Sequence, residues 1–128
     1  MQDNNSYELI CELQSAILND SLLKVQKLIE NDDVDVSYSN YMTAVDCDYI
    51  QILKYLLEKS KNPLDYAEYS LGIAAHIGRK KSIQTIMTFL MENKEKYGKN
   101  ELDSVIIKAV HQAINLDVVK CIVDNYEQ

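Results

Sequence analysis

Residues 116–124 read LDVVKCIVD, and residues 50–58 read IQILKYLLE. The same pattern returns as LLKVQKLIE at 22–30 and as IQTIMTFLM at 83–91. In every copy, apolar residues occupy the first, fourth, seventh and eighth positions, which lie on one face of an α-helix. The copies start 28, 33 and 33 residues apart. Helical stripes at such a period are typical of a stacked array of repeats.

A second, shorter helical pattern that contains small residues precedes each copy. The four segments are LICELQSAI at 9–17, MTAV at 42–45, SLGIAA at 70–75 and SVIIKAVHQAI at 104–114. Their alanines allow this inner helix to pack closely on the helix that follows. Short polar turns join the two helices, and the third turn, at 78–82, is the longest. Helices of this length are not stable alone in water, so their apolar stripes must be buried against neighbouring hairpins.

The repeated units resemble the ankyrin repeat over about residues 7–126, because the repeat length and the stretches LDVVKCIVD and IQILKYLLE match the second helix of that family. The family's Thr-Pro-Leu-His opening is missing. The glycine that usually closes the first helix is replaced by Asp20, Asp48, Lys81 and Ile114. The tetratricopeptide repeat is the alternative, but its spaced aromatic residues and terminal proline are absent. Divergence of this kind is similar to that of viral or host-associated bacterial ankyrin proteins.

The sequence therefore predicts an all-α fold, a solenoid of about four stacked helix-turn-helix hairpins that is ankyrin-like and degenerate. Residues 1–128 form a single domain with units at about 7–37, 38–66, 67–100 and 101–128. The bulk composition agrees, since 47% of the residues are hydrophobic and 26% are charged, as in globular domains. Three glycines and one proline are few, which favours helices joined by short loops.

Charge and cysteine content narrow the classes of partner and compartment. The net charge of −7 argues against nucleic acid or an anionic membrane as the main partner. The three cysteines are widely separated and form no CxxC pair, so we expect reduced, partly buried thiols in a cytoplasmic protein. The start, MQDNNSYELI, has neither the basic region nor the apolar core of a signal peptide. The cytoplasm of a host cell fits these expectations equally well.

No pattern of catalytic residues stands above background, so we expect neither an enzyme nor a cofactor. His76 and His111 both fall on predicted inner helices, 35 residues apart. They could be read as an acid–base or metal-binding pair, but no Cys or Asp joins either at ligand spacing. We interpret them as polar residues at the same helix position in two successive repeats, where that position faces a groove. The stretch NDDVDVS at 31–37 lacks the glycine and the glutamate of a calcium loop, so no metal site is predicted.

Resemblance to ankyrin repeats implies that partners bind the inter-repeat segments, here 31–41, 59–69 and 93–101, and the exposed side of the inner helices. Tyrosines gather in these segments, and tyrosine is enriched at interface hot spots. Neighbouring acids suit a basic partner surface. The alternative is that the tyrosines only cover helix ends and the acids are only solvated. The predicted partner-binding residues are Asp33, Asp35, Tyr38, Tyr41, Asp65, Tyr66, Tyr69, His76, Tyr97 and His111.

The predicted function is that of a protein–protein interaction module that binds and blocks or tethers a partner. An inhibitor or adaptor of viral or bacterial effector type is the favoured form. The alternative is an acidic protein that mimics nucleic acid and inhibits a DNA- or RNA-binding protein. The last predicted helix also has an apolar arc wider than one neighbour needs, which suggests either a homodimer or further elements that once followed in a longer protein. The arc comprises Val118, Val119, Cys121, Ile122 and Val123.

Overall fold

The computed structural model describes the backbone of residues 2–126 and the side chains of residues 6–126. This part of the chain is helical and contains no strand, which confirms the predicted all-α class. The helices are α1 (Gln2–Leu18), α2 (Leu22–Glu30), α3 (Tyr38–Asp46), α4 (Ile50–Lys59), α5 (Pro63–Ile77), α6 (Lys80–Glu92), η1 (Lys94–Lys96), α7 (Lys99–Gln112) and α8 (Leu116–Tyr126).

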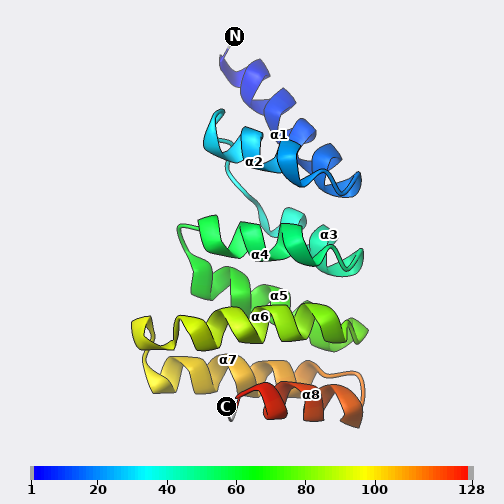
Figure 1. Ribbon diagram of the computed structural model, residues 1–128, viewed down its shortest axis with the longest axis vertical. Coiled ribbons are helices and arrows are strands. Elements are labelled where there is room, and N and C mark those ends of the chain that lie inside the picture. Colours follow the sequence, from blue (N-terminus) through cyan, green and yellow to red (C-terminus); the bar gives the residue numbers. More distant parts are fainter. Residues whose placement is uncertain (1, 127–128) are drawn as a thin grey trace.

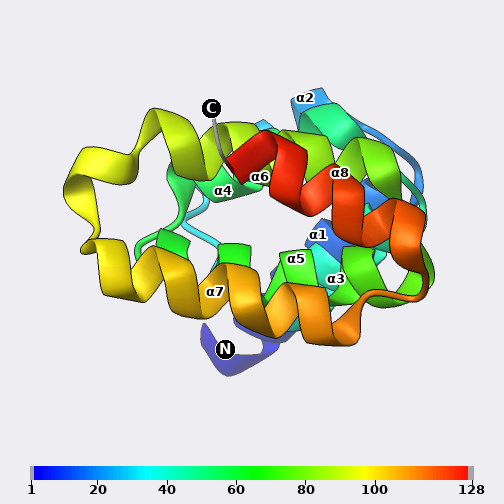
Figure 2. The same cartoon turned by 90° about the horizontal axis from the view of Figure 1, so that it is seen from below.

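The α-helices form four antiparallel hairpins that stack in chain order, from α1/α2 at one end to α7/α8 at the other (Figure 1). Helices α1, α3, α5 and α7 make one layer, and α2, α4, α6 and α8 make the second (Figure 2). Each helix packs on its hairpin partner and on its counterpart in the next hairpin. None of the described helices is long and apolar enough to cross a membrane.

The inner helices begin earlier in the chain than the sequence patterns indicated. Helix α5 starts at Pro63, whose fixed φ suits the first position of a helix. The predicted unit boundary at 66–67 therefore falls inside α5, and the loop before it is only 60–62. Likewise α3 starts at Tyr38, so the segment between the first two hairpins is 31–37.

The hairpin turns explain why the two later intervals differ from the 33 residues expected from the sequence. Asp20, Asp48 and Gly78 each follow an inner helix with left-handed φ values of 53°, 59° and 79°. Gly78, and not Lys81, therefore fills this position in the third hairpin, and the turn there is the short 78–79. Helices α2, α4, α6 and α8 start at residues 22, 50, 80 and 116, so the intervals are 28, 30 and 36.

The predicted apolar stripes form one continuous core between the two layers. Ala16, Ala44, Ala74 and Ala109 are at most 2% exposed, which allows the close helix packing that their small size predicted. The three cysteines are free thiols, and two of them are more exposed than expected. Cys11 and Cys47 are exposed, and Cys121 is half-buried.

A polar network, not foreseen from the sequence, joins the first two hairpins. Buried Asn40 donates through Nδ2 to Gln14 Oε1 at 2.7 Å, and Gln14 Nε2 donates to Thr43 Oγ1 at 2.7 Å. The Asn40 Oδ1 atom accepts the backbone N–H of Ser37 at 2.9 Å, which caps the start of α3. Buried polar groups stabilise a structure only when they are paired in this way.

Candidate functional site

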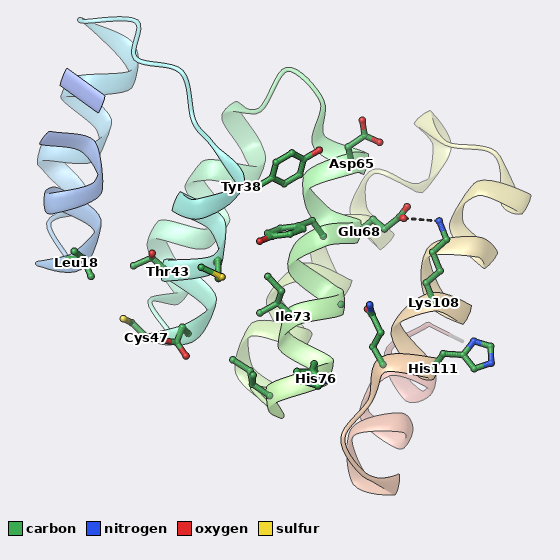
Figure 3. A pocket seen from close by; sticks show the side chains of 16 residues that line it. Leu18, Tyr38, Thr43, Cys47, Asp65, Glu68, Ile73, His76, Lys108 and His111 are labelled. Carbon is green, nitrogen blue, oxygen red and sulfur yellow. Dashed lines mark hydrogen bonds and ion pairs between the residues drawn. The ribbon is translucent and has the colours of Figure 1, made fainter. Parts of the chain in front are cut away.

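A groove of about 1270 Å³ runs across the layer of inner helices (Figure 3). Leu18 at the end of α1 closes one side, α3 and α5 form the middle, and α7 forms the other side. The lining residues are Leu18, Tyr38, Met42, Thr43, Asp46, Cys47, Asp65, Glu68, Tyr69, Gly72, Ile73, His76, Ile77, Lys108, His111 and Gln112. The groove lies on the exposed side of the inner helices, which is one of the two surfaces where the sequence predicts that a partner binds.

The groove gathers apolar side chains that remain open to solvent. Leu18, Tyr38, Met42 and Ile77 are 53%, 49%, 44% and 37% exposed, and all four line the groove. Tyr38 and Met42 stand one helical turn apart on α3, so their side chains share one face of that helix. Apolar side chains collected in a concave surface are typical of binding sites, whereas single exposed ones are normal on any protein.

Four tyrosines from α3 and α5 form an aromatic cluster at one end of the groove. The ring centroids of Tyr38 lie 4.8 Å from Tyr66 and 4.7 Å from Tyr69. The rings of Tyr41 and Tyr66 stack at 4.6 Å. Aromatic pairs at such separations hold one another in place. The Tyr38 ring is therefore held by Tyr66 and Tyr69 while part of it is exposed to solvent.

The structure corrects the role predicted for Tyr41. Its side chain is fully buried, and its hydroxyl donates a 2.7 Å hydrogen bond to the carbonyl of Leu56 in the last turn of α4. Burial raises the pKa of this hydroxyl above its ordinary value. Carbonyls in the last turn of a helix have no partner within the helix, so Tyr41 satisfies one of them. Tyr41 stabilises the fold and does not contact solvent.

Tyr66 and Tyr97 also lie outside the groove lining. Tyr66 is half-buried, and its hydroxyl donates to the carbonyl of Val36 at 3.2 Å. Tyr97 follows η1 in the predicted segment between the third and fourth hairpins. Its hydroxyl is buried without a hydrogen-bond partner among the described residues, and burial raises its pKa. The covering of helix ends, considered from the sequence as the alternative, describes Tyr41 better than partner contact does, whereas Tyr66 bonds the segment before α3.

The acidic candidates divide in the same way. Asp65 lines the groove from the first turn of α5, and Asp46 and Glu68 line it as well. Lys108 of α7 forms an ion pair with Glu68, with 2.9 Å between Nζ and Oε1. Asp33 and Asp35 are exposed on the segment between α2 and α3 and do not line the groove.

His76 and His111 lie at matching places near the ends of α5 and α7, and both line the groove and are exposed. The described residues contain no group of three His, Cys, Asp or Glu side chains that could hold a metal ion. Met42, Ile73 and Ile77 line the groove without having been predicted. The available signal was their four-residue spacing, which places Met42 on the same helix face as Tyr38, and Ile73 and Ile77 on the same face as Tyr69. This signal can be used only once the starts of α3 and α5 are known.

Comparison with known proteins adds no further identification. The chain matches no protein-family model, and searches of curated proteins and of solved structures find no significant match.

Proposed function

We propose that this protein is a protein-interaction module that binds a partner protein along the groove over α1, α3, α5 and α7. The supporting observation is that Leu18, Tyr38, Met42 and Ile77, all well exposed, meet in this one concave surface. Exposed apolar groups that gather in this way lose contact with water when a partner binds, which favours association. The protein acts as an inhibitor or adaptor by covering a surface of its partner.

The charges around the groove suit a basic segment of the partner. The lining holds the carboxylates Asp46, Asp65 and Glu68 and a single lysine, Lys108, which is paired with Glu68. Asp46 has only a 4.0 Å contact with exposed Arg79, and such exposed pairs contribute little. An acidic rim around an apolar floor attracts a segment with basic and apolar side chains, and the charge mainly speeds the encounter.

We infer that the four hairpins are divergent ankyrin units. Two observations support this relation: the two-layer stack of antiparallel hairpins, and the left-handed residues Asp20, Asp48 and Gly78 after the inner helices. The left-handed position is where the ankyrin resemblance places a glycine. The uneven intervals between hairpins are a departure from that family's regular repeat.

The test is affinity capture from host-cell lysate with the full chain and two matched variants. Met42→Glu places a charge in the groove, whereas Leu23→Glu places one on α2, where Leu23 is 82% exposed and outside the groove lining. We expect one protein to be retained in high salt by the parent chain and by Leu23→Glu. Its affinity for Met42→Glu should fall at least about tenfold, as at an interface hot spot.

Equal capture by Met42→Glu and Leu23→Glu would contradict binding in the groove. Capture that occurs only at low salt and favours nucleic-acid-binding proteins would instead support an acidic mimic of nucleic acid, because salt screens exposed charges.

A further inference from the structure

The last hairpin has an apolar outer face at the end of the stack, which we call the end face. It consists of Asp103, Ile107 and Val110 of α7 with Leu116, Val119 and Val123 of α8. Ile107 and Leu116 are 55% and 67% exposed, and the three valines are half-buried. Figure 2 views the molecule from this end, with α7 and α8 foremost.

Equivalent positions on α5 show what this face is shaped to contact. Glu68, Gly72 and Ala75 stand 35 residues before Asp103, Ile107 and Val110. In α5 all three positions face α7. Glu68 pairs with Lys108, a Cβ at Gly72 would meet the Gln112 side chain, and the Ala75 carbonyl accepts the N–H of Ile114, just after α7, at 3.0 Å.

Equivalent positions on the outer helices lead to the same conclusion. The fourth and eighth residues of α4 are Leu53 and Leu57, and those of α6 are Ile83 and Met87. All four are fully buried. In α8 these positions are Val119 and Val123, which are only half-buried, because the described residues supply no further hairpin to cover them. The end face is thus an internal surface of the stack that lies open.

At the opposite end of the stack the outer side of α1 is polar, while Leu23 of α2 is 82% exposed. Gln14 points from α1 toward α3, where it bonds Asn40 and Thr43. The 100° step between helical residues places exposed Glu8, Glu12 and Ser15 on the other side of α1. Polar outer faces of this kind are normal for the terminal units of repeat proteins. The end face departs from that rule, because Ile107 and Leu116 are well exposed there.

We propose that the end face binds the same face of a second copy of this chain, forming a closed twofold dimer. A twofold interface pairs one patch with itself, so one apolar end is sufficient. Head-to-tail stacking would instead place the apolar end against the polar α1 end. Charge also permits self-pairing despite the net charge of −7. The carboxylate of the end face, Asp103, is already bonded by Lys99 at 3.1 Å and by the Tyr126 hydroxyl.

The first test is the solution mass of the full chain over a range of concentrations. We expect the mass to rise from one chain to two and then stop. Ile107→Glu, at an exposed site, should keep helicity and remain monomeric at every concentration, whereas Leu23→Glu on α2 should dimerise as the parent does. A parent chain that stays monomeric, a mass that grows beyond two chains, or normal dimerisation of Ile107→Glu would overturn the proposal.

A charge-swap experiment then identifies which faces meet. One variant carries Ile107→Glu with Leu116→Glu, and the other carries Ile107→Lys with Leu116→Lys. We expect each to be monomeric alone and the mixture to form a mixed dimer that weakens in high salt, since opposite charges then face each other. A mixture that stays monomeric would overturn the pairing of like faces. Neither test depends on the groove, so either proposal can fail alone.

Discussion

Tyr38 and Tyr41 stand three residues apart on α3 and touch the same aromatic ring, yet they occupy different environments. Both ring centroids lie within 5 Å of that of Tyr66. Tyr41 is fully buried and bonds a helix-end carbonyl, whereas Tyr38 is 49% exposed and lines the groove. Tyr41 shares the core-facing side of α3 with Ala44 and Val45. Residue type therefore did not distinguish the two roles, and the side of the helix did.

Among substitutions that test this difference, those at Tyr41 should have the largest effect on stability. Tyr41→Ala should lower the free energy of unfolding by about 3–5 kcal/mol, because it leaves a cavity and removes the partner of the Leu56 carbonyl. Tyr41→Phe keeps the ring and should cost about 1–2 kcal/mol. Urea unfolding of the three chains measures both values. A loss below about 1 kcal/mol for Tyr41→Ala would contradict a structural role.

The difference between Tyr38 and Tyr41 also shows which parts of the fold could be predicted from the sequence. The apolar stripes of the outer helices were visible in the sequence because a 3.6-residue period shows directly. The start of α5 was not, because Asp65, Tyr66 and Tyr69 look like polar loop residues until Pro63 is placed at the first helical position. A three-residue error in the third repeat followed from aligning apolar letters without the Gly78 turn.

The candidate site was predicted in part for the same reason. Tyr38, Asp65, Tyr69, His76 and His111 do line one groove. The residues that lie elsewhere were chosen by type and by membership of a presumed loop, which cannot separate the two faces of a helix. The Gln14–Asn40 contact could not be foreseen, because it joins side chains 26 residues apart whose pairing depends on how two hairpins stack.

Tyr38 is expected to show the reverse of the behaviour of Tyr41. Tyr38→Ala should lower the free energy of unfolding by only about 1 kcal/mol, since it removes contacts with Tyr66 and Tyr69 but leaves no buried cavity. It should nevertheless weaken capture of a groove-bound partner by at least about tenfold. Urea unfolding and titration with the captured partner measure the two effects. A large loss of stability with unchanged binding would reverse the assignment of the two tyrosines.

Tyr66 lies between these extremes, so it tests whether its hydrogen bond to the segment before α3 is a separate contribution. Tyr66→Phe retains the ring that stacks on Tyr41 and loses only the 3.2 Å bond to the Val36 carbonyl. We expect a loss of about 0.5–1 kcal/mol in unfolding free energy, with partner capture unchanged. Tyr69→Phe is a matched control, because its hydroxyl has no hydrogen bond to the described residues. If both substitutions cost the same, the bond to Val36 contributes nothing measurable.

The smallest expected effect appears only in acid and compares a tyrosine bonded to a carbonyl with one bonded to a carboxylate. Tyr126 donates to Asp103, and this bond, followed by the contact from Lys99, lowers the pKa of Asp103 below its ordinary value of 3.8. A lowered folded-state pKa stabilises the fold above the unfolded pKa, and this stabilisation is lost as pH falls through the lowered value. As the pH falls below about 4, the free energy of unfolding should therefore decrease, and Asp103→Asn should reduce that decrease.

Tyr41→Phe is the control and should leave the acid dependence unchanged, because a carbonyl does not titrate in this pH range. Chemical unfolding at pH 5, 4, 3 and 2 measures all three chains. Equal acid slopes for the parent chain and Asp103→Asn would show that the Tyr126 bond does not couple folding to pH.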